Sequence, residues 1–191
     1  MSRPRDTQQS KLYRVERVWY NHYPVSKNPN DLDFKDEREA SNYATWIWIN
    51  FKKKIYPRPY KGMVPRVKVE WKNRGGWSYA MNSNGYYETK KGSKYKLIRL
   101  SGYHRNFHIL IHEMAHHIIP KYNPNNHSER LEAHGPEFAK LLMFLLAYYL
   151  DYDINYMVRT ANEHNLKFSS EDVYLNTQFN KLMEKQRQLI A

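Results

Sequence analysis

The sequence predicts an α+β protein in which a small twisted β-sheet packs against several helices. Two stretches, 106–120 and 136–150, carry apolar residues at the spacing that is typical of amphipathic helices. Between residues 64 and 101, short runs of β-branched and aromatic residues are separated by turns, which is typical of strands. Aromatic residues make up 15% of the 191 residues, so the chain can bury a sizeable core although its average composition is polar.

The first third of the chain is predicted to hold a tail and one long helix. Residues 1–10 are expected to form a flexible tail, while 12–20 fits either a strand or a short helix. The long helix begins near Asp33 or Asp36 and ends near Ile55. Acidic residues occupy its first turn and lysines its last, as the helix dipole favours.

Four short strands are predicted to follow and to form the sheet. Valine, tyrosine and tryptophan are frequent in them, and charged residues alternate with the apolar ones in the first. The predicted strands lie at 64–71, 77–81, 86–87 and 95–100. After the helices at 106–120 and 136–150, two more helices are expected near 154–166 and 170–190, with Ser169 or Ser170 as the N-terminal cap of the last one.

The helix at 106–120 carries the strongest functional signal. Asn106 suits its N-cap, and Pro120 cannot continue it. His112 and His116 lie four residues apart, so their imidazoles point the same way about one turn apart, and Glu113 reaches the same side. This His-Glu-x-x-His spacing predicts two nitrogen ligands for one Zn²⁺ and a carboxylate beside the water bound to the metal. The competing interpretation is a helix whose histidines are merely buried and hydrogen-bonded.

A catalytic zinc site needs a third protein ligand and leaves one position open, whereas a structural site needs four protein ligands. His134 is the main candidate for the third ligand, because Gly135 and Pro136 fix its backbone at the start of the next helix. The alternative third ligands in the same part of the chain are His127, Glu129, Glu132 and Glu137.

Together these two motifs resemble the SprT-like family of zinc metalloproteases, which includes the Spartan proteases. The sequence His112-Glu113-Met114-Ala115-His116, a polar loop, and His134-Gly135-Pro136-Glu137-Phe138 are similar to the family's HExxH and HGxxF motifs. The resemblance covers roughly residues 35–150. It implies a zincin-like fold and a zinc-dependent endopeptidase, with Zn²⁺ held by His112, His116 and His134 and Glu113 as the general base. It also implies protein substrates that are bound or crosslinked to DNA.

The resemblance also sets the expected domain organisation. It implies an N-terminal tail and lead-in segment at 1–32, an SprT-like protease domain at 33–150 and a C-terminal helical extension at 151–191. In zinc proteases with the HExxH motif, a strand edge beside the active helix holds the substrate chain in extended form. Leu97–Ser101 is one candidate for that edge.

Positive charge is concentrated in one part of the chain. The formal net charge is +12, and residues 52–105 hold fifteen Lys or Arg against two acidic residues, Glu70 and Glu88, so this segment alone carries +13. Such a concentration favours a polyanionic partner, most simply nucleic acid, through counterion release. The alternative is a solubilising surface. Membrane binding is not expected, because the charges do not follow an amphipathic helix.

The absence of cysteine excludes disulfides, a zinc ribbon and cysteine nucleophiles. Many SprT-like proteins carry a zinc ribbon, so contact with DNA would here depend on the basic segment or the C-terminal helices. Met1–Lys11 is polar and basic, unlike a signal peptide, and the apolar stretch Leu141–Leu150 is too short to span a bilayer. We therefore expect a cytoplasmic protein, in the host cytoplasm if it is viral, and a phage or bacterial source would suit its compactness.

Two other functions fit the same sequence. The first is a non-catalytic, nucleic-acid-associated or phage virion structural protein that retains a zincin-like fold. The second is a metal-dependent hydrolase whose substrate is not a protein. Cleavage of a protein that depends on Glu113 would separate the protease from both.

Overall fold

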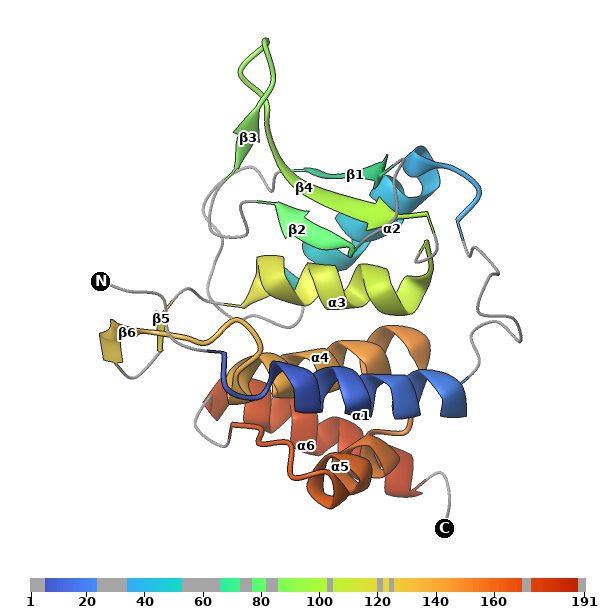
Figure 1. Ribbon diagram of the computed structural model, residues 1–191, viewed down its shortest axis with the longest axis vertical. Helices are drawn as coiled ribbons and strands as arrows, with labels where there is room; N and C mark the ends of the chain where they lie inside the picture. The colour runs from blue at the N-terminus through green and yellow to red at the C-terminus, as the bar shows by residue number, and fades with distance from the viewer. Residues whose placement is uncertain are drawn as a thin grey trace. The chain divides into compact units, whose positions relative to one another are not determined.

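The computed structural model describes residues 6–23, 34–52, 66–72, 77–81, 86–102, 105–119, 122–123, 126–169 and 173–188. By its backbone contacts the chain divides into two compact units, one formed by Val25–Ile118 and the other by Met1–Pro24 together with Ile119–Ala191 (Figure 1). Both helices and strands are present, so the predicted α+β class is confirmed. The domain boundaries predicted from the sequence follow a different division and stay a prediction.

A mixed sheet with β4 (Lys94–Ser101) at its centre is the framework of the unit Val25–Ile118. β1 (Arg66–Lys72) pairs with β4 in parallel, and β2 (Tyr79–Met81) pairs with it antiparallel on the other side. β3 (Tyr87–Glu88) forms an antiparallel hairpin with the first residues of β4. The prediction that Leu97–Ser101 is an edge for substrate was wrong, because β4 is the central strand and Leu97–Arg99 pair with β1 on one side and β2 on the other.

Two helices of the same unit pack on the sheet, α2 (Glu37–Asn50) along β1 and α3 (Phe107–Ile118) against β2 and β4 (Figure 1). Both begin at an expected cap. Asp36 accepts a hydrogen bond from the backbone N–H of Glu39 at 2.7 Å, and Asn106 accepts one from Ile109 at 2.9 Å. The predicted end of the first helix near Ile55 lies outside the described residues.

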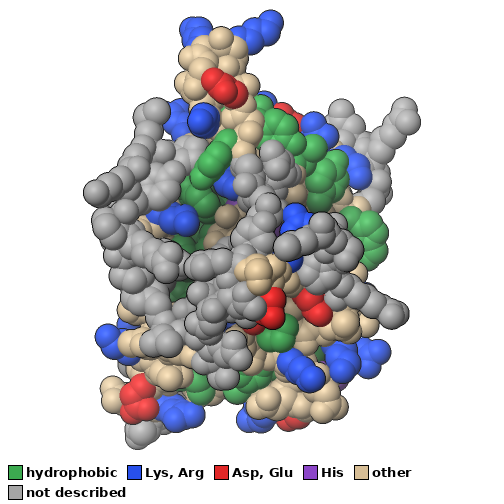
Figure 2. Space-filling model, turned by 90° about the vertical axis from the view of Figure 1, so that its left-hand side faces the viewer, with side chains coloured by type: hydrophobic (Ala, Val, Ile, Leu, Met, Phe, Trp, Pro, Cys, Tyr) green, Lys and Arg blue, Asp and Glu red, His purple; other side chains and the backbone are tan. Residues whose placement is uncertain are grey.

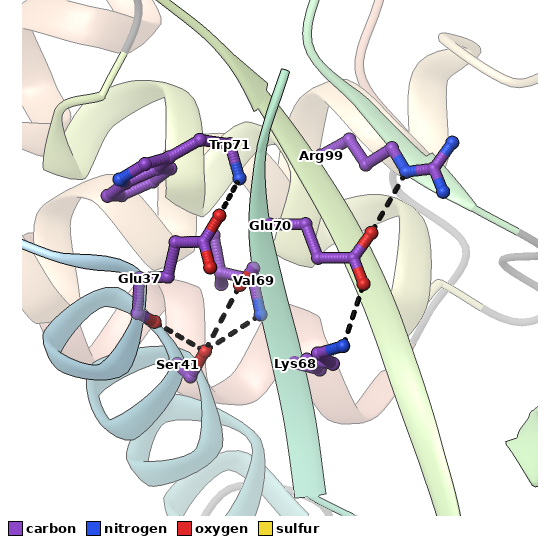
Figure 3. Close-up of polar contacts among 7 residues, drawn as sticks. All are labelled: Glu37, Ser41, Lys68, Val69, Glu70, Trp71 and Arg99. Carbon is purple, nitrogen blue, oxygen red and sulfur yellow. Dashed lines mark hydrogen bonds and ion pairs between the residues drawn. The ribbon is translucent and has the colours of Figure 1, made fainter. Parts of the chain in front are cut away.

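Side chains of α2 cover the outer edge of β1 (Figure 3). Three alternate backbone N–H groups of the strand donate to acceptors on the helix. The bonds run from Val67 to Thr45 Oγ1 (3.0 Å), from Val69 to Ser41 Oγ (2.8 Å) and from Trp71 to Glu37 Oε1 (2.6 Å). An uncovered edge is a template for pairing with other chains, so these contacts close one side of the sheet.

The match between helix and strand follows from their repeats. Residues four apart in an α-helix are separated by ~6 Å along its axis, and residues two apart in a strand by ~6.6 Å. Positions 37, 41 and 45 therefore present acceptors at nearly the spacing of the N–H groups of alternate strand residues. Thr45 also donates its hydroxyl proton to the carbonyl of Val67 at 3.2 Å, so one side chain serves both polar groups of that residue.

The unit formed by Met1–Pro24 and Ile119–Ala191 is mainly helical. It contains α1 (Gln9–His22), α4 (Pro136–Leu150), α5 (Ile154–Glu163), α6 (Val173–Gln188) and a hairpin of β5 (Tyr122–Asn123) and β6 (Asn126–Arg130). Residues 12–20 are thus helical, and the polar loop expected before His134 contains a hairpin that was not predicted. The cap expected for α6 lies partly outside the described residues.

α4 matches its predicted span, and ten of its fifteen residues are buried, so it forms the core of this unit. It ends where Asp151 adopts a left-handed conformation with φ 55°, and Asp153 then caps α5 by accepting from Asn155 N at 2.8 Å. In the parts of the chain that are described, no helix has the length and apolar character needed to cross a membrane.

Asp6–Ser10 do not form the flexible tail that was expected. The side chain of Gln8 donates to the carbonyl of Lys167 at 3.0 Å and accepts from its N–H at 3.1 Å, and Thr7 donates its hydroxyl to Glu132 at 2.9 Å. These side-chain contacts fix the chain just before α1, although nothing in its local composition indicates them.

Removing the hydroxyl that binds both polar groups of Val67 is expected to destabilise the protein. Thr45→Val keeps the shape of the side chain but leaves a strand N–H and a carbonyl without their partner, which should lower the free energy of unfolding by ~1–2 kcal/mol. Thr45→Ser retains the hydroxyl and serves as the control. Chemical denaturation of the two variants measures the difference, and equal stability would show that α2 does not secure this edge.

Candidate metal site

Both apolar and polar side chains of α3 are buried. Leu110, Ile111 and Met114 are completely buried, as their helical spacing predicts. His112 and Glu113 are also buried, at 6% and 5% exposure, although they are polar. The rings of His112 and His116 lie with their centroids 5.1 Å apart, so the helix presents the two imidazoles as neighbours one turn apart.

His134 is buried and lies immediately before α4. Gly135 occupies the N-cap of that helix and Pro136 its first turn. A Cβ atom at position 135 would approach the Cβ of Glu132 to 2.9 Å, so only glycine fits without a shift of the chain. The Gly-Pro pair therefore holds His134 at a fixed point of the backbone, as the sequence suggested.

The three predicted ligands form one group. Ligand atoms of His112, His116 and His134 all lie within 4.8 Å of one another. Among the described residues, these three form the group of His, Cys, Asp or Glu side chains that could hold a metal ion. Three imidazoles suit Zn²⁺ and other borderline transition metals, and they leave a coordination position open. The donor set therefore fits the metal that the motif predicts, without identifying it.

The alternative third ligands are less well placed. Glu132 accepts hydrogen bonds from the hydroxyl and the backbone N–H of Thr7, and Glu129 is exposed on β6. Glu137 is half-buried in the first turn of α4 and does not belong to the histidine group. The side chain of His127 lies outside what the structure describes.

Two residues beside His134 were missed by the sequence analysis. The carboxylate Oδ2 of Asp6 lies 2.5 Å from Nδ1 of His134, and the hydroxyl of Tyr13 lies 3.3 Å from its Nε2. They precede His134 by 128 and 121 residues, respectively. No motif or periodicity connects positions so distant, so the sequence contained no signal for either.

His117, the residue after His116, is buried, and its Nε2 lies 3.0 Å from the carbonyl oxygen of Leu97 in β4. This contact joins α3 to the central strand of the sheet.

The basic segment places several of its cations over aromatic rings. Arg105 lies 4.7 Å from the ring centre of Trp71, and Lys72 lies 5.2 Å from that of Tyr79. Figure 2 shows further Lys and Arg side chains at the projecting tip of the hairpin between β3 and β4. Glu70 pairs with both Lys68 and Arg99, at 2.7 and 3.1 Å, and so offsets part of this charge (Figure 3).

Lys96 is the most deeply buried of the cations that the structure describes in this segment. Its ammonium lies 4.6 Å from the ring centre of Tyr86 and 5.6 Å from that of Trp48, and Lys52 lies over the same Trp48 ring at 5.0 Å. Burial, together with repulsion from Lys52, lowers the pKa of Lys96 from 10.5 to about 8.

Comparison of the chain with models of protein families, with curated proteins and with solved structures finds no match. What the site can do is therefore inferred from its residues and their geometry.

Replacing any of the three histidines is expected to reduce metal binding. The wild-type protein should be purified with about one metal ion per chain, and His112→Ala, His116→Ala and His134→Ala should each lose most of it, because two imidazoles alone hold a divalent ion weakly. His22→Ala removes an exposed histidine outside the group and is the matched control. Elemental analysis by mass spectrometry measures the content, and full retention in His134→Ala would exclude it as a ligand.

Removing the buried charge of Lys96 is expected to stabilise the protein at pH 7. Between pH 8 and 10.5 the Lys96 amine is protonated more often in the unfolded chain than in the folded chain. The destabilisation caused by burying its charge is therefore fully present below pH 8 and disappears as the pH approaches 10.5. Lys96→Met should raise the free energy of unfolding at pH 7 by ~1–2 kcal/mol once solvent screening is allowed for. The gain should shrink across that pH range in denaturation experiments, whereas Lys94→Met, on the exposed start of β4, should show no such trend.

Proposed function

We propose that the protein is a zinc-dependent endopeptidase with a zincin-like fold, of the SprT-like type. The observation that carries the proposal is the group formed by His112, His116 and His134, with Glu113 buried next to the first of them on α3. Three neutral nitrogen ligands and an adjacent carboxylate are the donor set of a catalytic rather than a structural zinc site.

Each side chain then has a defined task. The three histidines would hold Zn²⁺, which, when bound, polarises a carbonyl group and lowers the pKa of water. Glu113 would accept the proton of the attacking water and deliver it to the leaving amine. Its burial supports this role, because a carboxylate with little access to solvent interacts strongly with nearby charge.

The sheet suggests where an extended substrate would bind. α2 covers the outer edge of β1, and β4 has partners on both sides. Of the strands that the structure describes, β2 pairs with β4 alone and also contacts α3, which carries His112 and His116. We therefore assign the substrate-binding edge to β2, where main-chain hydrogen bonds would hold a peptide in extended form.

The charge distribution supports a substrate associated with nucleic acid. Residues 52–105 carry a net charge of +13, and in the described part of this segment cations lie over the rings of Trp71 and Tyr79. Lysine and arginine next to aromatic side chains suit the phosphates and bases of a flexible strand. A protein already bound to DNA would be brought to the active site by the same attraction.

Replacing Glu113 by Gln tests the proposed chemistry. The amide cannot accept the proton, so cleavage of a basic DNA-bound protein should fall by at least ~10²-fold, while metal content and thermal stability should stay close to those of the wild type. The assay is gel electrophoresis with purified protein, with and without DNA. Metal at one ion per chain without cleavage that depends on Glu113 would favour the non-catalytic alternative, and cleavage that DNA does not change would remove the link to nucleic acid.

A further inference from the structure

The N-terminal segment contacts one of the proposed ligands directly. Asp6 Oδ2 lies 2.5 Å from Nδ1 of His134, at the limit of a short, charge-assisted hydrogen bond. A carboxylate only accepts, so the proton of this bond is on Nδ1, and in the neutral imidazole the lone pair is then on Nε2. Tyr13 agrees with this assignment, because its hydroxyl lies 3.3 Å from Nε2 and can donate to it.

Asp6 is held firmly enough to orient the ring. Gln8 makes two hydrogen bonds to the backbone of Lys167, and the backbone N–H of Thr7 donates to Glu132. The side chain of Asp6 is 22% exposed, and its second oxygen, Oδ1, is buried without a hydrogen-bond partner among the described residues. Among the described residues, the Asp6 carboxylate therefore bonds through Oδ2 to His134.

We propose that Asp6 is a positioning residue for His134, which it holds in the tautomer and orientation that offer Nε2 to the metal. The proposal rests on the metal site of the proposed function. A histidine ligand whose second nitrogen donates to a carboxylate is both oriented and made more basic, and loss of such a partner typically costs about 10- to 100-fold in metal affinity. The hydroxyl of Tyr13 lies 3.3 Å from Nε2, the nitrogen that would bind the metal.

The metal-affinity test compares Asp6 with its neighbour. Asp6→Ala should weaken Zn²⁺ binding by about 10- to 100-fold in chelator competition. Asp6→Asn keeps an oxygen that can accept from Nδ1 and should lose only part of that affinity. Thr7→Val removes the adjacent hydroxyl contact to Glu132 without touching His134, so it should bind Zn²⁺ like the wild type. If Thr7→Val weakens binding as much as Asp6→Ala, the effect is general loosening of the segment and the proposal is wrong.

A second measurement reads the tautomer without metal or activity. In the metal-free full-length protein, at a pH where the imidazole is neutral, ¹⁵N NMR of the His134 ring should show the proton on Nδ1. In Asp6→Ala it should show a mixture of tautomers or the Nε2–H form, because the carboxylate no longer selects one. An unchanged ring spectrum would overturn the role of Asp6, even if the protein binds zinc and cleaves substrate.

Zn²⁺ affinity and the ring tautomer of His134 together distinguish a failure of the proposed metal site from a failure of the role of Asp6. If the wild-type protein binds no zinc but its ring tautomer depends on Asp6, the metal function fails and the positioning contact stands. Tyr13→Phe should leave Zn²⁺ affinity undiminished, since its hydroxyl competes with the metal for Nε2. If Tyr13→Phe lowers Zn²⁺ affinity as much as Asp6→Ala, the hydroxyl of Tyr13 does not compete with the metal for Nε2. Visible spectra of the Co²⁺-substituted proteins provide the geometric check, because Asp6→Ala should alter the ligand field and Thr7→Val should not.

Discussion

The burial of ionisable side chains on α3 is the constraint on which the proposed site depends. Four of the twelve residues of this helix, His108, His112, Glu113 and His117, are almost inaccessible to solvent. Such groups destabilise a fold unless hydrogen bonds or a bound ion satisfy them. His117 meets this demand through the carbonyl of Leu97, which ties the helix to the sheet. A cation held by His112, His116 and His134 would add to the stability of this buried group, so folding and the proposed function would be linked.

The sequence allowed good prediction of the elements whose signals are local. The apolar spacing of α3 and α4, the cap at Asn106 and the Gly135-Pro136 helix start all depend on residues within one or two turns of each other. The sequence could also predict that His112, Glu113 and His116 are neighbours, since a single helical turn sets their geometry. The choice of His134 as the third ligand rested on the Gly135-Pro136 pair and on the resemblance, because composition alone left His127, Glu129, Glu132 and Glu137 as alternatives.

What the sequence could not show arises from contacts between distant segments. The position of β4 inside the sheet depends on pairing with β1 in parallel and with β2 antiparallel, and strand composition does not determine that order. The short strands of β5 and β6 lack the alternation that would have distinguished them from a loop. Asp6 was assigned to a tail because the residues around it are polar, yet its carboxylate reaches a histidine 128 positions away.

The covering of β1 also bears on the reaction that we propose. A β-sheet that binds an extended peptide needs one accessible edge, and an accessible edge exposes the protein to pairing with other chains. α2 removes this liability on one side by placing Glu37, Ser41 and Thr45 over alternate residues of β1. An added strand would therefore have to join on the side of β2, the strand that contacts the helix of His112 and His116. The packing of α2 along β1, which protects that edge of the sheet, would thus leave the β2 side, next to the helix of the proposed ligands His112 and His116, for a substrate chain.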